Sequence, residues 1–246
     1  MQNALFVGTS SQIALQRELE VIANNVANAS TTGFKARNSR FEEYLMPTAS
    51  ADSFQSPDRR LSYVIDKGTT LDLTQGSIEQ TGNPLHVAVR GEAFLAVQTP
   101  QGPRYTRNGA FEIDAQGNLV TSDGHQVQGE AGPITLNPQE TGVSIGPDGT
   151  VSTNVGIRGR LRLVTFARPQ ALRNEGGNLY SSQDQPQPAG LAGRVESGAL
   201  ERSNVRPVVE MTRLMDVNRT YAMVSSVISR LDDLRGTAIR RLADVA

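Results

Sequence analysis

The 246-residue sequence contains no cysteine, no tryptophan and only two histidines, His86 and His125. Without cysteine the chain cannot form a disulfide framework, a thiolate zinc site, an iron–sulfur cluster or a cysteine nucleophile. Two histidines are also too few for a multi-histidine metal site. No glycine-rich phosphate loop, Ser-His-Asp order or paired-carboxylate motif stands out. We therefore expect no catalytic residue, no bound metal and no cofactor, and hence a protein that is not an enzyme.

An excess of charge of one sign is also missing. The 24 basic and 25 acidic residues leave a formal charge of −1, which provides no field for holding nucleic acid or an acidic membrane surface. No stretch reaches the 18 or more apolar residues of a membrane span, so direct membrane insertion is not expected. Residues 1–16 lack the basic and apolar parts of a secretory signal. The default location is cytoplasmic, although export without a cleaved signal would leave no trace.

Aromatic residues are scarce, at 5% of the chain, whereas 23 glycines and 12 prolines supply many turns. Between residues 76 and 200 polar and apolar residues alternate, as at 85–90 and 158–163, and turn sequences recur at short intervals. This pattern predicts a central antiparallel β domain, partly closed or sandwich-like.

The first region has the periodicity of a helix. Its apolar stripe steps alternately by three and four residues through Leu5, Gly8, Gln12, Leu15, Leu19, Ile22, Val26 and Ala29. Such a narrow stripe is typical of a coiled-coil seam. The helix is expected to stop around residues 28–33, where poor helix formers lead to Gly33, a residue suited to a left-handed cap.

The last region repeats this pattern. Pro207 suits a first helical position. The stripe that follows consists of Leu214, Val217, Tyr221, Val224, Ile228 and Leu231. The rest of this helix surface is expected to be charged and solvated.

These elements predict an α+β protein whose terminal helices pair as a coiled coil in an assembled tube around a central antiparallel β domain. The expected domains are an N-terminal assembly helix at 1–36, an extended arm or linker at 37–75, the β-rich outer domain at 76–200 and a C-terminal assembly helix at 201–246. The arm could begin with a helical extension through Phe41, Tyr44 and Leu45. Because nucleation is costly for the poor helix formers at 8–11, we expect both termini to fold only on assembly.

Three motifs carry a resemblance that covers nearly the whole chain. They are Ala23-Asn24-Asn25-Val26-Ala27-Asn28-Ala29-Ser30-Thr31-Thr32-Gly33-Phe34-Lys35, the segment Leu200 to Thr212, and the pair Tyr105-Thr106-Arg107-Asn108-Gly109-Ala110-Phe111 and Gly117 to Thr121. They resemble the terminal signatures and the β-domain repeat of the flagellar basal-body rod and hook family.

The resemblance implies a structural axial subunit of the bacterial flagellum that assembles helically, transmits torque and contacts copies of itself and neighbouring rod proteins. It also implies export by the flagellar type III apparatus without a cleaved signal, and a place in the rod that crosses the periplasm. The segments 129–136 and 203–208, and Gly91-Glu92-Ala93-Phe94-Leu95 where distal rod subunits have another motif, favour the proximal rod. A distal-rod or hook-type subunit is the alternative, and a carbohydrate-binding β domain of the cell envelope is a third reading.

The predicted assembly residues come from the two stripes and the N-terminal signature. They are Leu15, Leu19, Ile22, Asn24, Asn25, Val26, Asn28, Gly33, Phe34, Leu214, Val217, Tyr221, Val224, Ile228 and Leu231. The three asparagines are weak helix formers, which suggests that their side chains hydrogen-bond to neighbouring subunits.

Overall fold

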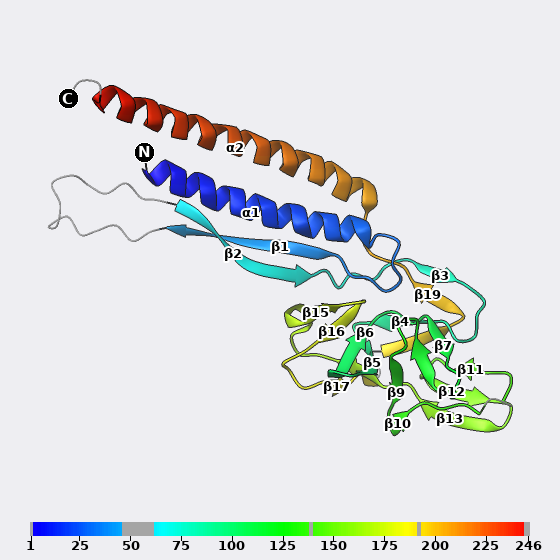
Figure 1. Ribbon diagram of the computed structural model, residues 1–246. Coiled ribbons are helices and arrows are strands. Elements are labelled where there is room, and N and C mark those ends of the chain that lie inside the picture. Colours follow the sequence, from blue (N-terminus) through cyan, green and yellow to red (C-terminus); the bar gives the residue numbers. More distant parts are fainter. Residues whose placement is uncertain (1, 46–61, 138–139, 191–192, 244–246) are drawn as a thin grey trace. The chain divides into compact units, whose positions relative to one another are not determined.

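The computed structural model describes residues 2–45, 62–137, 140–190 and 193–243, and the chain forms two compact units. The first, called the helical unit here, draws on residues 1–26, 37–70 and 207–246. The second, called the β unit, is formed by residues 27–36 and 71–206. The class is α+β, as predicted, with a helix near each end of the chain and antiparallel strands between them (Figure 1).

Two long helices make up most of the helical unit. Helix α1 spans Gln2–Ala27 and helix α2 spans Pro207–Ala243. The proline occupies the first position of α2, where its missing N–H costs nothing, and Arg240 and Arg241 lie in the last turn, where positive charge opposes the helix dipole. The end of α1 at Ala27 lies just before the predicted stop.

The remainder of the helical unit is a ribbon of two strands, β1 (Arg37–Leu45) and β2 (Ser62–Leu71). The arrows in Figure 1 run in opposite directions, so the ribbon is antiparallel. The helical extension through Phe41, Tyr44 and Leu45 is therefore wrong, because all three lie in β1. Much of the expected arm is a strand pair that belongs with the helices. Its polar stretch at 47–57 lies outside the described residues.

The β unit contains the other strands and one short 3₁₀ helix, η1 (Pro169–Ala171). Its strands are β3 (Ile78–Gln80), β4 (Val87–Gly91), β5 (Phe94–Thr99), β6 (Gly102–Thr106), β7 (Phe111–Ile113), β8 (Leu119–Thr121), β9 (Gln126–Gly129), β10 (Gly132–Pro133), β11 (Ser144–Ile145), β12 (Thr150–Thr153), β13 (Gly156–Arg160), β14 (Leu163–Thr165), β15 (Arg173–Gly176), β16 (Leu179–Ser181), β17 (Gln187–Pro188), β18 (Gly193–Ser197) and β19 (Ala199–Glu201).

These strands form one large sheet and three small ones. The main path of the large sheet is β15-β16-β6-β5-β9-β8-β7, with β10, β14 and β17 attached to it. The small sheets are β11-β12-β13, β18-β4 and β19-β3, and the strand pairings in them are antiparallel. The central antiparallel β domain is therefore confirmed.

Four of the aromatic residues form one cluster in the β unit. Phe94, Phe166, Tyr105 and Tyr180 meet edge to face, with ring centroids 4.8–6.0 Å apart. A separate aliphatic cluster built around Val87, Leu95 and other fully buried side chains forms the larger core. The scarcity of aromatics in the sequence therefore does not leave the β unit without a core.

The unit boundaries differ from the expected domain boundaries at both junctions. Residues 27–36, which the expected N-terminal domain at 1–36 included, belong to the β unit, as do residues 201–206, which the expected C-terminal domain at 201–246 included. The difference arises from contacts within the β unit, which are described below.

Candidate functional site: the terminal helices and the junction that carries them

The two terminal helices pair with each other in antiparallel fashion. The amide of Gln12 donates to the Tyr221 hydroxyl at 3.1 Å, and Arg213 binds Glu18 at 2.7 Å. Towards the start of α1, a side chain on Gly8 would meet Ile228 at 3.0 Å. Partners thus descend along α2 as they ascend along α1, which brings the two predicted stripes together.

Most of the predicted stripe residues face the inside of this pair. Ile22 and Val217 are buried. The others are half-buried: Leu15, Leu19, Val26, Leu214, Tyr221, Val224, Ile228 and Leu231. The stripes are thus placed as a seam within one chain.

Helix α1 has a second inward face that the sequence analysis missed. Ala14, Val21 and Asn25 are buried, although they lie off the predicted stripe. They are spaced seven and four residues apart, so a second helical repeat was present as a signal. Helix α1 is therefore covered on two sides within the helical unit.

The Asn25 side chain is used inside the chain. Its Oδ1 accepts from the N–H of Arg37 at 2.9 Å, while its Nδ2 donates to the Arg37 carbonyl and to Glu210. Asn25 is 1% exposed, so these contacts, rather than the expected ones to a neighbouring subunit, use its amide group. Asn24 is exposed. Asn28 accepts from the Thr31 hydroxyl in the turn that follows α1.

Helix α2, in contrast, carries exposed apolar side chains outside the seam. We call six of them, each more than half exposed, the outer stripe: Val208, Met211, Met215, Met223, Val227 and Leu234. Within the residues that the structure describes, they lie beside exposed charged residues such as Arg219 and Asp233. The expectation of a charged and solvated remaining surface is therefore only partly met for α2.

Gly33 and Phe34 lie in the β unit, where they fix the chain that follows α1. Gly33 has a φ of +68°, and an added Cβ would come within 2.5 Å of the backbone of Arg107 and Asn108. Phe34 is buried with Ala36 and Val205. Both residues therefore hold the segment that follows α1 within the β unit, and their predicted part in assembly stays a prediction.

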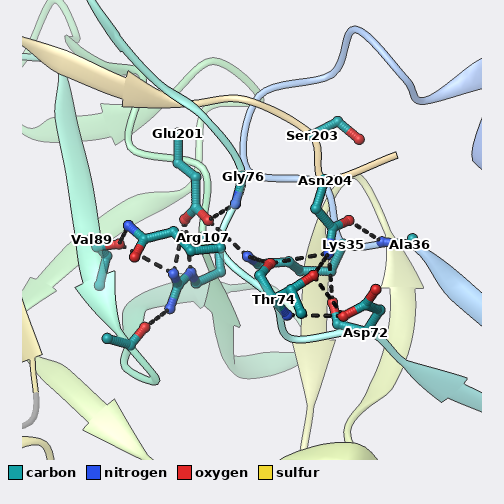
Figure 2. A network of polar contacts seen from close by, with 12 residues as sticks. Lys35, Ala36, Asp72, Thr74, Gly76, Val89, Arg107, Glu201, Ser203 and Asn204 are labelled. Atoms are coloured by element: carbon teal, nitrogen blue, oxygen red, sulfur yellow. Dashed lines mark hydrogen bonds and ion pairs between the residues drawn. The ribbon is translucent and has the colours of Figure 1, made fainter. Parts of the chain in front are cut away.

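The carboxylate of Glu201 collects two cations at this junction (Figure 2). Its Oε1 accepts from Lys35 Nζ at 2.7 Å and from the Gly76 N–H at 3.0 Å. Its Oε2 accepts from Arg107 Nε at 3.0 Å and from a second guanidinium nitrogen at 2.9 Å. Lys35, Arg107 and Glu201, called the ion cluster below, come from three distant parts of the chain.

The ion cluster is almost completely withdrawn from water. Its side chains are 1% exposed for Lys35, 2% for Arg107 and 0% for Glu201. The remaining donors are satisfied by backbone carbonyls: Lys35 donates to Thr74, and Arg107 donates to Gly91, Ala93 and Val89. Buried charges are tolerated when they are paired and hydrogen-bonded in this way. Burial lowers the pKa of Lys35, and the attraction of Glu201 opposes that shift.

All three residues of the ion cluster lie inside the sequence motifs, but no role was predicted for any of them. The available signal was a charged residue within each motif. Such a signal cannot be distinguished from an ordinary surface charge until the fold shows that the three meet.

The site offers no group for chemistry on a small molecule. Within the residues that the structure describes, no three metal-ligating side chains of the usual kinds come together. Across the same ranges, neither helix has the length and apolar character required to span a membrane. What the arrangement does offer is an outward apolar helix face and a rigidly bonded junction.

Comparisons with known proteins agree with this architecture. Three family models match the chain: a flagella basal body rod protein model over residues 5–35, the D1 domain of flagellar hook proteins FlgE/F/G over 88–153, and the C-terminal region of flagellar basal body rod proteins over 196–241. Each segment supplies one member of the ion cluster, in the order Lys35, Arg107 and Glu201.

Full-length relatives point the same way. The flagellar basal-body rod protein FlgF of Caulobacter vibrioides is 38% identical, with all of both chains covered. FlgF of Escherichia coli is 33% identical, with 99% of each chain covered, and the rod protein FlgG of Agrobacterium fabrum is 32% identical, with 97% of this chain and 99% of its own covered.

The chain belongs to the flagellar basal-body rod protein family. It is a structural subunit of the basal-body rod, in a family of structural proteins rather than enzymes, and it assembles with other rod subunits in the basal body.

Proposed function

We propose that the chain is a subunit of the proximal rod and that it joins neighbouring subunits through the outer stripe of α2. The observation that carries the proposal is that α2, within the residues that the structure describes, keeps the exposed apolar side chains of the outer stripe in addition to the seam that α1 covers. A face that differs from the surface it contacts on the next subunit forms a heterologous interface, which builds helical filaments instead of closed dimers.

The composition of the outer stripe suits this role. Three of its six members are methionines, whose flexible thioether side chains adapt to differently shaped partners. A rod subunit at a boundary contacts both its own copies and a neighbouring rod protein. An adaptable apolar face is consistent with both contacts and with transmission of torque through packed helices.

A variant with two charges on the outer stripe tests the assembly proposal. Burying one methionine contributes about 1.5–3 kcal/mol, so Met215→Asp combined with Met223→Asp should lower incorporation into purified basal bodies at least tenfold and abolish swimming. Asn218→Asp, an exposed α2 position outside the outer stripe, is the control for added negative charge. Normal incorporation of the double variant, with helix content retained, would rule out the outer stripe as the interface.

The proximal position is supported by relatives named FlgF that match the full length at 30–38% identity. Relatives named FlgG match nearly as well, at 31–32%, and make a distal-rod subunit the second candidate. Electron microscopy of basal bodies with this subunit labelled separates the two. We expect label at the base of the rod and few copies, whereas label along the distal part would favour the second candidate.

The route to the rod is part of the same proposal. A structural subunit of the basal body must leave the cytoplasm, and we infer that the flagellar type III apparatus exports this chain into the rod as it crosses the periplasm. Accumulation of the chain in cells that lack the export apparatus, with none outside the cytoplasm, is the expected result. Unchanged export in such cells would contradict this route.

A further inference from the structure

At this junction, docking of the N-terminal segment depends on the C-terminal segment, whereas the C-terminal segment pairs without the N-terminal one. The C-terminal segment, residues 199–206, is bonded directly to the β unit. Strand β19 pairs with β3, and the N–H of Arg202 donates to the Ser77 carbonyl at 2.8 Å. Glu201 also meets Arg107 at 2.9 Å, which forms a neutral pair without any help from the N-terminal signature.

The N-terminal segment, residues 29–36, is bonded in part to that C-terminal segment. The N–H of Gly33 donates to the Glu201 carbonyl at 2.7 Å, and the N–H of Ala36 donates to Asn204 Oδ1 at 2.7 Å. Phe34 packs on Val205 in the same cluster. Without residues 199–206, the N-terminal segment would lose these contacts together. Elsewhere in the β unit, Asn178 donates to the Thr32 carbonyl and the N–H of Asp72 donates to the Ala36 carbonyl.

The charge of Lys35 makes docking of the N-terminal segment depend on Glu201 more strongly than the hydrogen bonds alone would. If Glu201 were absent, the Lys35 ammonium would be buried beside the guanidinium of Arg107, with the Thr74 carbonyl as its described hydrogen-bond acceptor and the carboxylate of Asp72 as a weaker attraction. Two unpaired buried cations are far more costly than an unmade neutral contact. Removing Lys35 leaves less damage, because Glu201 keeps Arg107 and the Thr74 carbonyl still accepts from Asn204 at 3.0 Å.

We propose that Lys35 is a positioning residue that allows the N-terminal segment to dock on the β unit only after Glu201 is in place. The two residues are 166 positions apart in the chain. During synthesis from the N-terminus, the signature that follows α1 therefore stays undocked until nearly the whole β unit and its last strand exist. The dependence keeps the N-terminal segment from docking on an incomplete β unit.

Amide hydrogen exchange on the full chain tests this order, with three variants: Glu201→Gln, Lys35→Met and both together. The N–H groups of Gly33 and Ala36 report docking of the N-terminal segment, and the N–H of Arg202 reports pairing of the C-terminal segment. In Glu201→Gln we expect protection at Gly33 and Ala36 to fall roughly 10- to 100-fold. The N–H of Arg202 should lose less protection, because β19 keeps its pairing with β3.

The double variant provides the decisive comparison. We expect Lys35→Met to keep protection at Gly33 and Ala36 within about threefold. Added to Glu201→Gln, it should recover most of the lost protection, because no buried ammonium is then left unpaired. No loss in Glu201→Gln, or no recovery in the double variant, would overturn the proposal. If Glu201→Gln alone fails to fold, a folded double variant supports the proposal and an unfolded one overturns it.

Discussion

At the scale of single residues, the terminal signatures owe their composition to one crowded place in the β unit. Gly33 lies against the backbone of Arg107, and Lys35 reaches the carboxylate of Glu201 within the same segment. A side chain at position 33 would collide with the very strand end that presents Arg107. The glycine and the lysine therefore serve one purpose, which is to bring the N-terminal segment close to a buried anion.

Gly33→Ala should be much more damaging than a matched glycine replacement. Gly82 has a similar φ of +71° but no atom within 4 Å of an added Cβ. We expect Gly82→Ala to cost about 1 kcal/mol of unfolding free energy for its backbone conformation. Gly33→Ala should cost about 3 kcal/mol because overlap is added to that strain. Urea unfolding followed by tyrosine fluorescence measures both, and equal costs would argue against close packing at Gly33.

At the scale of elements, α2 is the least ordinary part of the structure because it carries exposed apolar side chains outside its seam with α1. Helix α1 covers the side that includes Val217 and Ile228, while the outer stripe stays exposed. This 37-residue helix therefore has a seam that contacts its own chain and an outer stripe that is available to another chain. The neighbouring residues Val227 and Ile228 lie on these different faces, which makes them a matched pair.

Ile228→Asp should separate the two faces experimentally. A carboxylate placed against α1 near Gly8 should lower the stability of the helix pair by about 3 kcal/mol. Circular dichroism at 222 nm should therefore show an earlier thermal transition for Ile228→Asp. Val227→Asp should leave that transition unchanged and instead impair incorporation into the rod. An unchanged transition in Ile228→Asp would contradict the seam.

At the scale of the whole molecule, the two units differ in how their cores are built. The β unit contains a large cluster of side chains at or near zero exposure, including Val87, Leu95 and Leu119. Most seam residues of the helical unit are only half-buried, and the first half of α1 contains the poor helix formers Gly8-Thr9-Ser10-Ser11. Less burial per residue means less free energy to oppose unfolding.

The helical unit should therefore be the less protected one in the free chain. In amide exchange on dilute protein, we expect residues 10–28 to exchange at least about tenfold faster than the strands around Leu95. Assembly should then slow exchange in α1, because its folding is coupled to burial between subunits. Protection across residues 10–28 equal to that of the β unit would show that the helices are stable before assembly.

The sequence by itself determined the features that depend on neighbouring residues. The three-and-four spacing from Leu15 to Ile22 and from Leu214 to Leu231 specified two helices and their inward faces, because helical periodicity is a local property. Pro207 marked the start of α2 for the same reason. Alternation and turns specified an antiparallel β region, and the motifs identified the family.

Tertiary structure decided what depends on partners far away in the chain. Phe41, Tyr44 and Leu45 have a spacing that fits a helix, but pairing with β2 makes them part of a strand, and no local pattern contains that partner. Val208 and Met215 resembled residues of a solvated surface until α1 was seen to cover only the seam of α2. Lys35 and Glu201, 166 positions apart, form a buried ion pair only because the fold of the β unit brings residues 29–36 and 199–206 to Arg107.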